Sequence, residues 1–120
     1  MAFSQQLDPL LTKDVKAQKE WVQERMIEMS LDEKIGQLFM IQAYSNKDKK
    51  HRKRIEAEIK KHHIGGLIFM QGTPKKQAEL NNRYQEKSKI PLLIGFDGEW
   101  GLDMRLKKTF RYPWNMTLGA

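Results

Sequence analysis

The densest group of chemically capable side chains in this 120-residue sequence lies at residues 97–105, which read DGEWGLDMR. Three carboxylates, an arginine, a tryptophan and two glycines share these nine positions. Such a set could be an ordinary turn, because Asp and Gly are common turn formers. It could also be a binding loop, in which a carboxylate accepts hydrogen bonds from vicinal hydroxyls, the arginine donates others, and the indole covers an apolar sugar face.

Two other kinds of chemistry fit this loop less well. Gly95, Gly98 and Gly101 have the spacing G-x-x-G-x-x-G, which differs from the G-x-G-x-x-G of dinucleotide-binding loops. Asp97 and Glu99 could form the carboxylate pair of a retaining glycosidase, whose carboxyls lie about 5 to 5.5 Å apart. Two positions apart on one backbone, however, they cannot easily bracket opposite faces of a sugar. The loop therefore predicts binding rather than bond cleavage.

The sequence predicts no metal site and no cofactor. It contains no cysteine, which removes disulfides, thiolate nucleophiles and cysteine metal ligands. His62 and His63, with His51 upstream, are the only histidines. Adjacent side chains on a helix point about 100° apart, and no carboxylate–histidine spacing completes a coordination shell. We expect His62 and His63 to complement the negative end of a helix dipole.

Three apolar runs of strand length must position the loop. We expect strands at residues 38–41, 67–70 and 90–96, although the first run could also be a buried helix turn. Because the later runs lack polar alternation, they predict strands buried on both faces of a parallel sheet. Ligands of such sheets meet the carboxyl ends of the strands, which is where Asp97 follows the third run.

Two helix patterns precede the first strand. Residues 12–29 carry a stripe of apolar side chains at helical spacing, formed by Val15, Val22, Met26 and Met29. Ser30 and Glu33 then have the spacing of a capping box, so a short helix is expected from Leu31. Trp21 and Trp114 are expected to be packing residues, and the seven methionines to fill the core.

The basic segment at residues 47–63 predicts a second long helix. Ile55, Ile59 and His63 recur every four residues and would face inward, and the Gly65–Gly66 pair would end the helix in a left-handed conformation. The chain has 22 Lys and Arg against 15 Asp and Glu, and five of the seven excess charges lie in this segment. No aromatic residues are interleaved with them, which favours a solvated helix face over a nucleic-acid surface.

A third helix is expected at residues 74–88. Thr73 followed by Pro74 is typical of an N-cap with proline at the first helical position. The side chains expected to face the core are Ala78, Leu80 and Tyr84.

Three ordered motifs connect these elements: SLDEKIGQLFM at 30–40, IGGLIF at 64–69 and IPLLIGFDGEWG at 90–101. Together they resemble the opening of the catalytic domain of glycoside hydrolase family 3. The resemblance runs from about residue 8 to the C-terminus, and it is strongest to the bacterial β-N-acetylglucosaminidase (β-hexosaminidase) branch.

The resemblance implies an α/β fold, the N-terminal part of a TIM-type (β/α)8 barrel with about three β/α units. Residues 1–120 would be a partial N-terminal domain, with a leading helix in 1–30 and the first units in 31–120. By length alone, the chain is either a small open α/β domain or the first part of a barrel, since a closed barrel needs about 250 residues. An incomplete barrel has an unpaired edge, which predicts self-association or pairing with the missing C-terminal remainder.

The implied activity of the parent protein is retaining hydrolysis of terminal β-linked sugars, by a glycosidase of the β-N-acetylhexosaminidase or β-glucosidase type. Asp97 would hydrogen-bond to the sugar hydroxyl groups, and Arg105 would share that contact with the substrate. Glu99 and Trp100 are candidate sugar contacts. Many relatives read D-x-E-G-G-R here, so Trp100 and Leu102 depart from the commoner pattern. Because these two residues lie in the loop expected to contact the sugar, the resemblance alone does not fix which sugar is preferred.

The family's aspartate nucleophile and its His/Asp acid–base pair fall beyond position 120, and no residue present matches them. We therefore expect this chain alone to hydrolyse nothing. One alternative stays open: a basic α/β module that binds an acidic partner or nucleic acid through residues 47–63, with a vestigial loop. Such binding would weaken steeply between about 50 and 200 mM salt.

No membrane span is expected, because the longest apolar runs are far shorter than the roughly 18 residues that a bilayer-crossing helix needs. The first residues, MAFSQQLD, lack the basic and apolar regions of a secretory signal. Members of the family are commonly exported, which implies a periplasmic or secreted parent. The compartment of this chain is not set by its sequence.

Overall fold

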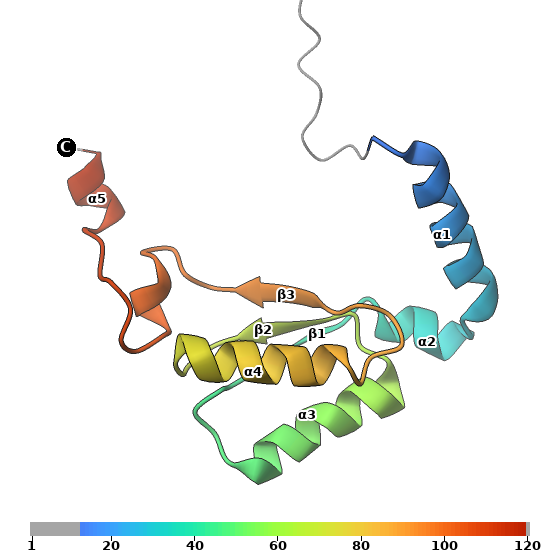
Figure 1. The fold of residues 1–120 in the computed structure, drawn as a ribbon, viewed down its shortest axis with the longest axis horizontal. Coiled ribbons are helices and arrows are strands. Elements are labelled where there is room, and N and C mark those ends of the chain that lie inside the picture. Colours follow the sequence, from blue (N-terminus) through green and yellow to red (C-terminus); the bar gives the residue numbers. More distant parts are fainter. Residues whose placement is uncertain (1–12, 120) are drawn as a thin grey trace, which may run out of the picture. The chain divides into compact units, whose positions relative to one another are not determined.

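The structure, a computed structural model, describes residues 13–119. They fall into two compact units that divide after Ser30. The first unit contains α1 (Val15–Glu28), and Figure 1 labels the α-helices and β-strands of both units. The elements of the second unit are, in order, α2 (Leu31–Gly36), β1 (Met40–Ala43), α3 (Lys49–His62), β2 (Gly66–Phe69), α4 (Pro74–Gln85), β3 (Leu93–Phe96), the 3-10 helix η1 (Leu102–Met104) and α5 (Asn115–Leu118).

Helix α1 lies within residues 12–29, where the apolar stripe predicts a helix. It begins where the Asp14 carboxylate accepts a hydrogen bond from the Ala17 amide at 2.9 Å. No residue within the helix is buried. Val15, Val22 and Met26 of the apolar stripe are exposed, as is Trp21 at 49%, and only Met29, which follows the helix, is buried. The prediction that Trp21 is a packing residue is therefore wrong. Ion pairs one turn apart, such as Arg25–Glu28 at 2.8 Å, add a few tenths of a kcal/mol each to such a helix.

The second unit is built on a three-stranded sheet in the order β1-β2-β3, with both pairs parallel. This confirms the predicted parallel α/β arrangement. The first strand begins two residues later than expected, because the Leu38 and Phe39 amides still donate to carbonyls of α2, at 3.0 Å each. Leu38 and Phe39 therefore belong to the turn after that helix.

Helices α3 and α4 cover one face of the sheet (Figure 1) and enclose the core. The rings of Phe69 and Tyr84 stack with centroids 6.4 Å apart. The buried cluster consists of Ala43, Ile55, Ile59, Ile64, Leu67, Phe69, Leu80, Tyr84 and Leu92. Ala78 was expected to face this core but is exposed, because the inward stripe of α4 runs through Leu80 and Tyr84.

The burial of the strands differs from the prediction in one place. Strand β2, the central strand, is nearly continuously buried, as its sequence predicts. Strand β3 is not, since Leu93 is 71% exposed and Ile94 37%. It is an edge strand of the described sheet, and only a neighbouring strand and a further covering layer could bury it. Met40 of the other edge strand is also 46% exposed, so it does not fill the core as expected.

The end of α3 has a different left-handed residue from the one predicted. His63 adopts φ 49° as the C-cap, whereas Gly65 and Gly66 have no positive φ. These glycines serve close packing instead, because a Cβ on Gly65 would lie 2.0 Å from the Gln37 carbonyl oxygen. The side-chain Nε2 of Gln37 donates to the His63 carbonyl oxygen at 2.6 Å, which holds the left-handed turn in place.

Candidate functional site

The loops that follow the three strands are joined by backbone hydrogen bonds. The Ser45 amide, after β1, donates to the Gln71 carbonyl, after β2, at 2.9 Å. Gly72 in turn donates to the Arg105 carbonyl at 3.2 Å and accepts from the Lys107 amide at 2.9 Å. The loop after β3 is therefore fixed against the other two at the carboxyl edge of the sheet, toward which the strand arrows point in Figure 1.

Gly72 makes this junction sterically possible. Its φ is +154°, and a Cβ there would lie 1.6 Å from the Ser45 hydroxyl oxygen. Leu106 anchors the other side of the junction, since it pairs with Gly72 in a parallel bridge and is only 4% exposed. Arg105 is thus held by the buried residue that follows it.

The two residues predicted to bind substrate lie together at this edge. Asp97 follows the last residue of β3, and its carboxylate accepts a hydrogen bond from the terminal nitrogen of Arg105. The Arg105 Nε also donates to the Asp97 carbonyl oxygen at 3.1 Å. The side chain of Asp97 remains 36% exposed and that of Arg105 remains 19% exposed. Since a carboxylate accepts several hydrogen bonds and a guanidinium carries five donors, the pair presents both functions to a ligand.

The other two candidates lie in the turn after Asp97. The Gly101 amide donates to the Gly98 carbonyl at 2.9 Å and closes the turn around Glu99 and Trp100. Both side chains are exposed, Trp100 by 41%. The turn therefore exposes the indole three residues after Asp97.

An aromatic pair lies next to this turn and was missed by the sequence reasoning. The rings of Trp100 and Trp114 have centroids 5.2 Å apart and are tilted by 31°. Trp114 was expected to be a packing residue, yet it is 53% exposed. The signal that could have found it is the aromatic density of FRYPW at residues 110–114. A small pocket of about 170 Å³ is lined by Trp100, Asp103, Met104, Arg111, Tyr112 and Trp114.

A buried histidine supports the loop after β1. The Nε2 of His51 accepts a hydrogen bond from the Tyr44 amide at 3.2 Å, so the ring is neutral in this arrangement. Burial lowers the pKa of His51, and the nearby Lys47 and Arg54 charges lower it further. The Lys47 ammonium also lies 3.7 Å from the centre of the Tyr44 ring.

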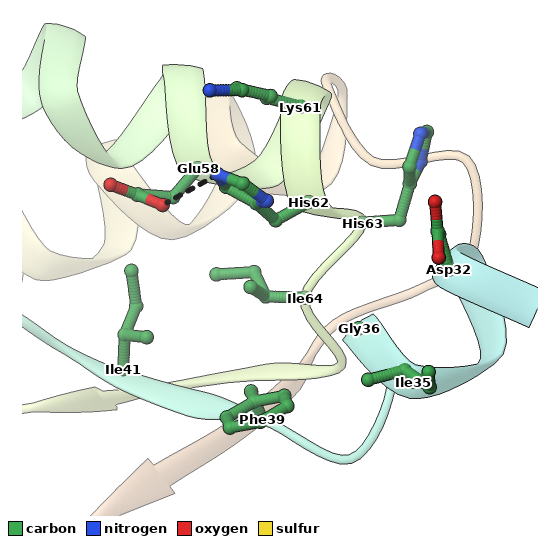
Figure 2. Close-up of a pocket in the computed structure, with 10 residues that line it drawn as sticks. All are labelled: Asp32, Ile35, Gly36, Phe39, Ile41, Glu58, Lys61, His62, His63 and Ile64. Carbon is green, nitrogen blue, oxygen red and sulfur yellow. Dashed lines mark ion pairs between the residues drawn. The ribbon is translucent and has the colours of Figure 1, made fainter.

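A larger hollow of about 570 Å³ lies at the opposite end of the sheet, where β1 and β2 begin. Figure 2 shows its lining residues, which are Asp32, Ile35, Gly36, Phe39, Ile41, Glu58, Lys61, His62, His63 and Ile64. His62 pairs with Glu58 at 3.8 Å. Ligands of parallel sheets bind at the carboxyl ends of the strands, so we do not assign the substrate site to this hollow.

Neither a metal centre nor a membrane span is found in the part of the chain that the structure describes. No group of three or more His, Cys, Asp or Glu residues between 13 and 119 could hold a metal ion. Over the same residues, no helix has the length and apolar character needed to cross a bilayer.

Comparison with known proteins identifies the family of the chain. Residues 30–120 match the family model described as the glycosyl hydrolase family 3 N-terminal domain. The chain belongs to glycosyl hydrolase family 3. This confirms the resemblance that the three motifs indicate. The N-terminal domain of family 3 has a TIM-barrel-type fold, and the second unit is a small α/β part with a parallel three-stranded sheet.

Two family 3 relatives illustrate the similarity. A β-N-acetylglucosaminidase/β-glucosidase from Cellulomonas fimi is 29% identical over 100 residues, which make up 83% of this chain and 17% of that protein. The structure of the β-glucoside phosphorylase BglX bound to 2FGlc matches with a TM-score of 0.58 and 26% identity, over 70% of this chain and 17% of that one. The chain thus spans about a sixth of either relative. Neither supports the alternative of a nucleic-acid module.

Proposed function

We propose that this chain is the N-terminal portion of a retaining glycoside hydrolase that acts on terminal β-linked N-acetylglucosamine or related sugars, and that Asp97 and Arg105 bind the hydroxyl groups of that sugar. The observation that carries the proposal is the Asp97–Arg105 pair at the carboxyl edge of the sheet. The name of the Cellulomonas fimi relative, which includes both N-acetylglucosamine and glucose, supports this substrate class.

The geometry of the pair suits polyol recognition. Two hydrogen bonds from one guanidinium to the carbonyl and carboxylate of the same residue fix both side chains before a ligand arrives. Such preorganisation lowers the entropy lost on binding. The carboxylate would accept hydrogen bonds from neighbouring hydroxyls, while the remaining N–H groups of Arg105 would donate to a sugar oxygen. The result is a sugar held in one orientation relative to the strand ends.

Bond cleavage is assigned to residues outside this chain. A retaining mechanism needs a carboxylate nucleophile and a proton donor on opposite sides of the scissile bond. Asp97 is paired with Arg105, and the Asp103 carboxylate lies 3.9 Å from the Arg111 Nε. We therefore assign the chain the work of positioning the sugar, which contributes to catalysis by orientation, and we expect no hydrolysis by the chain alone.

The binding role is tested by titrating the 120-residue chain with methyl N-acetyl-β-glucosaminide. Asp97→Asn removes the charge at constant shape and should weaken binding about 10- to 100-fold, because hydrogen bonds to charged groups contribute about 1.5 to 3 kcal/mol. Asp32→Asn is the matched control, since Asp32 is an exposed carboxylate at the amino end of the sheet. Equal affinities for the two variants would refute the proposed role of Asp97.

The expected lack of hydrolysis has its own test. The chain should release no p-nitrophenol from p-nitrophenyl N-acetyl-β-glucosaminide above the rate in buffer. Release well above that rate, retained after ion-exchange and size-exclusion steps, would show that a nucleophile and a proton donor are present among these residues.

A further inference from the structure

A pocket of about 200 Å³ lies between the loop after β1 and the first turns of α3 and α4. We propose that this pocket binds a small oxyanion of the phosphate type, either free or as the terminal group of a monoester. Neither Asp97 nor Arg105 lines it, so the proposal is independent of the proposed sugar-binding role. The lining residues are Ser45, Lys47, Arg52, Lys76, Glu79 and Leu80.

Three cations reach this pocket from separate segments of the second unit. Lys47 follows β1, Arg52 lies in the first turn of α3, and Lys76 lies in the first turn of α4. Both helices begin at the edge of the sheet toward which the strand arrows point in Figure 1, so the parallel topology gathers the three side chains. Glu79 is the single acid among the lining residues. The lining therefore has an excess of positive charge.

These cations have no carboxylate partner in the part of the chain that the structure describes. None of the ion pairs between residues 13 and 119 includes Lys47, Arg52 or Lys76. The two glutamates of α3 are paired with Arg83 and with His62 instead. Arg52 is also partly buried, and a partly buried charge without an acceptor costs free energy. An oxyanion in the pocket would supply that acceptor.

The donors in the lining suit a tetrahedral oxyanion. A guanidinium donates two parallel hydrogen bonds to two oxygens of a phosphate, and an ammonium group adds a point charge to a third. A phosphate monoester keeps three such terminal oxygens. The volume of about 200 Å³ is below the roughly 300 Å³ at which pockets for drug-sized ligands begin. The pocket therefore favours a small anion.

A merely solvated basic surface is the alternative explanation, because the chain has 22 Lys and Arg. The Lys47 ammonium, however, is held 3.7 Å from the centre of the Tyr44 ring. This contact restricts the side chain before an anion arrives and lowers the entropy lost on binding. The two explanations differ in what they predict for Glu79. A local site is strengthened when its one negative charge is removed, whereas attraction to the net charge of the whole chain depends little on which charge is changed.

The experiment titrates the 120-residue chain with inorganic phosphate at pH 7.5 and constant ionic strength, following the backbone amides by NMR. The shifts should concentrate at Ser45, Arg52 and Lys76. Lys76→Gln should weaken phosphate binding about 2- to 5-fold, and Glu79→Gln should tighten it by a similar factor, as expected for exposed charges. Both positions are exposed on α4, so neither variant should disturb the fold.

Lys60→Gln is the matched control. It removes the same charge from an exposed position of α3 that does not line the pocket. Lys60 is eight residues after Arg52, about 12 Å along the helix, which exceeds the screening length of about 8 Å at 0.15 M salt. The control should therefore bind phosphate like the parental chain. Equal weakening in Lys76→Gln and Lys60→Gln, an unchanged affinity in Glu79→Gln, or shifts spread over all basic residues would overturn the proposal.

A parallel titration with methyl phosphate distinguishes the two sources of the oxyanion. Binding as tight as that of inorganic phosphate, with the same opposite responses to the two α4 variants, assigns the site to a monoester. Binding of inorganic phosphate alone assigns it to the free ion. If neither ligand shifts the amides that line the pocket, the proposal is wrong.

Discussion

The two ends of the sheet in the second unit differ in what they offer a ligand. The amino end has the larger hollow, about 570 Å³, with an apolar lining that includes Ile35, Phe39 and Ile64. The carboxyl end has a smaller pocket but brings together the Asp97–Arg105 pair, the Asp103–Arg111 pair and two indoles. Volume alone would select the amino end. The topology of the sheet and the chemistry of the side chains favour the carboxyl end.

The largest expected effect comes from the glycines that pack each end. Gly72→Ala should destabilise the second unit by about 1 to 3 kcal/mol, through its positive φ and its clash with Ser45. It should also weaken sugar binding, because Gly72 contacts the Arg105 backbone. Gly65→Ala, at the amino end, should destabilise the unit and leave the affinity of the remaining folded chain unchanged. Urea unfolding and sugar titration measure both quantities. Parallel losses of affinity in the two variants would remove the distinction between the ends.

The next largest effect is expected from replacing the planar guanidinium of Arg105 with a lysine ammonium group. Arg105→Lys keeps the charge but cannot make both bonds to Asp97. We expect about a 10-fold loss of affinity for methyl N-acetyl-β-glucosaminide, which corresponds to about 1.4 kcal/mol. Lys61→Ala in the amino-end hollow is the control and should bind normally. An unchanged affinity in Arg105→Lys would mean that charge alone suffices.

A smaller effect depends on pH. The pKa of His51 is lowered in the folded chain, so below pH 6.5 the unfolded chain binds a proton more readily than the folded one. The stabilisation that comes from neutral His51 is therefore fully present above pH 6.5. It is lost as the pH falls from 6.5 toward the lowered pKa of His51 in the folded chain, by less than about 1.4 kcal/mol per pH unit. The difference between the melting temperatures at pH 8 and at pH 5.5 should be smaller for His51→Gln than for the parental chain. The same comparison on His62→Gln serves as the control, and an identical difference in both variants would exclude His51 as the cause.

The smallest effect tests the open edge of the sheet. We expect the chain to self-associate in the absence of further strands, because β3 is an edge strand and Leu93 on it is exposed. Leu93→Lys should raise the concentration at which association begins, measured by light scattering during size exclusion. Leu102→Lys, on an exposed leucine of η1, should change it less. A parental chain that is monomeric at all concentrations would contradict the expectation.

Local signals were sufficient to predict much of this fold. The Thr73 cap followed by Pro74 starts α4 as expected, and the uninterrupted apolar run at residues 67–70 becomes the buried central strand. Asp97 could be placed at the carboxyl edge because a strand that ends at Phe96 fixes the position of the next residue. These features depend only on neighbours in the sequence.

The features that could not be predicted depend on contacts between distant segments. The exposure of β3 follows from its place at the edge of the sheet, which its own residues do not reveal. Gly65 is needed because the Gln37 backbone approaches it, and a sequence shows only the glycine. The Trp100–Trp114 contact requires the turn at Gly101, η1 and the chain reversal after it, and no spacing rule connects residues so placed.

The most direct test of the account is a map of where the sugar binds. Amide chemical shifts of the 120-residue chain, recorded during titration with methyl N-acetyl-β-glucosaminide, should change at residues 97–106 and at Gly72 and should leave the amino end unaffected. Changes concentrated at Phe39, His62 and Ile64, or no changes at any sugar concentration, would contradict the assignment of the site to the carboxyl edge.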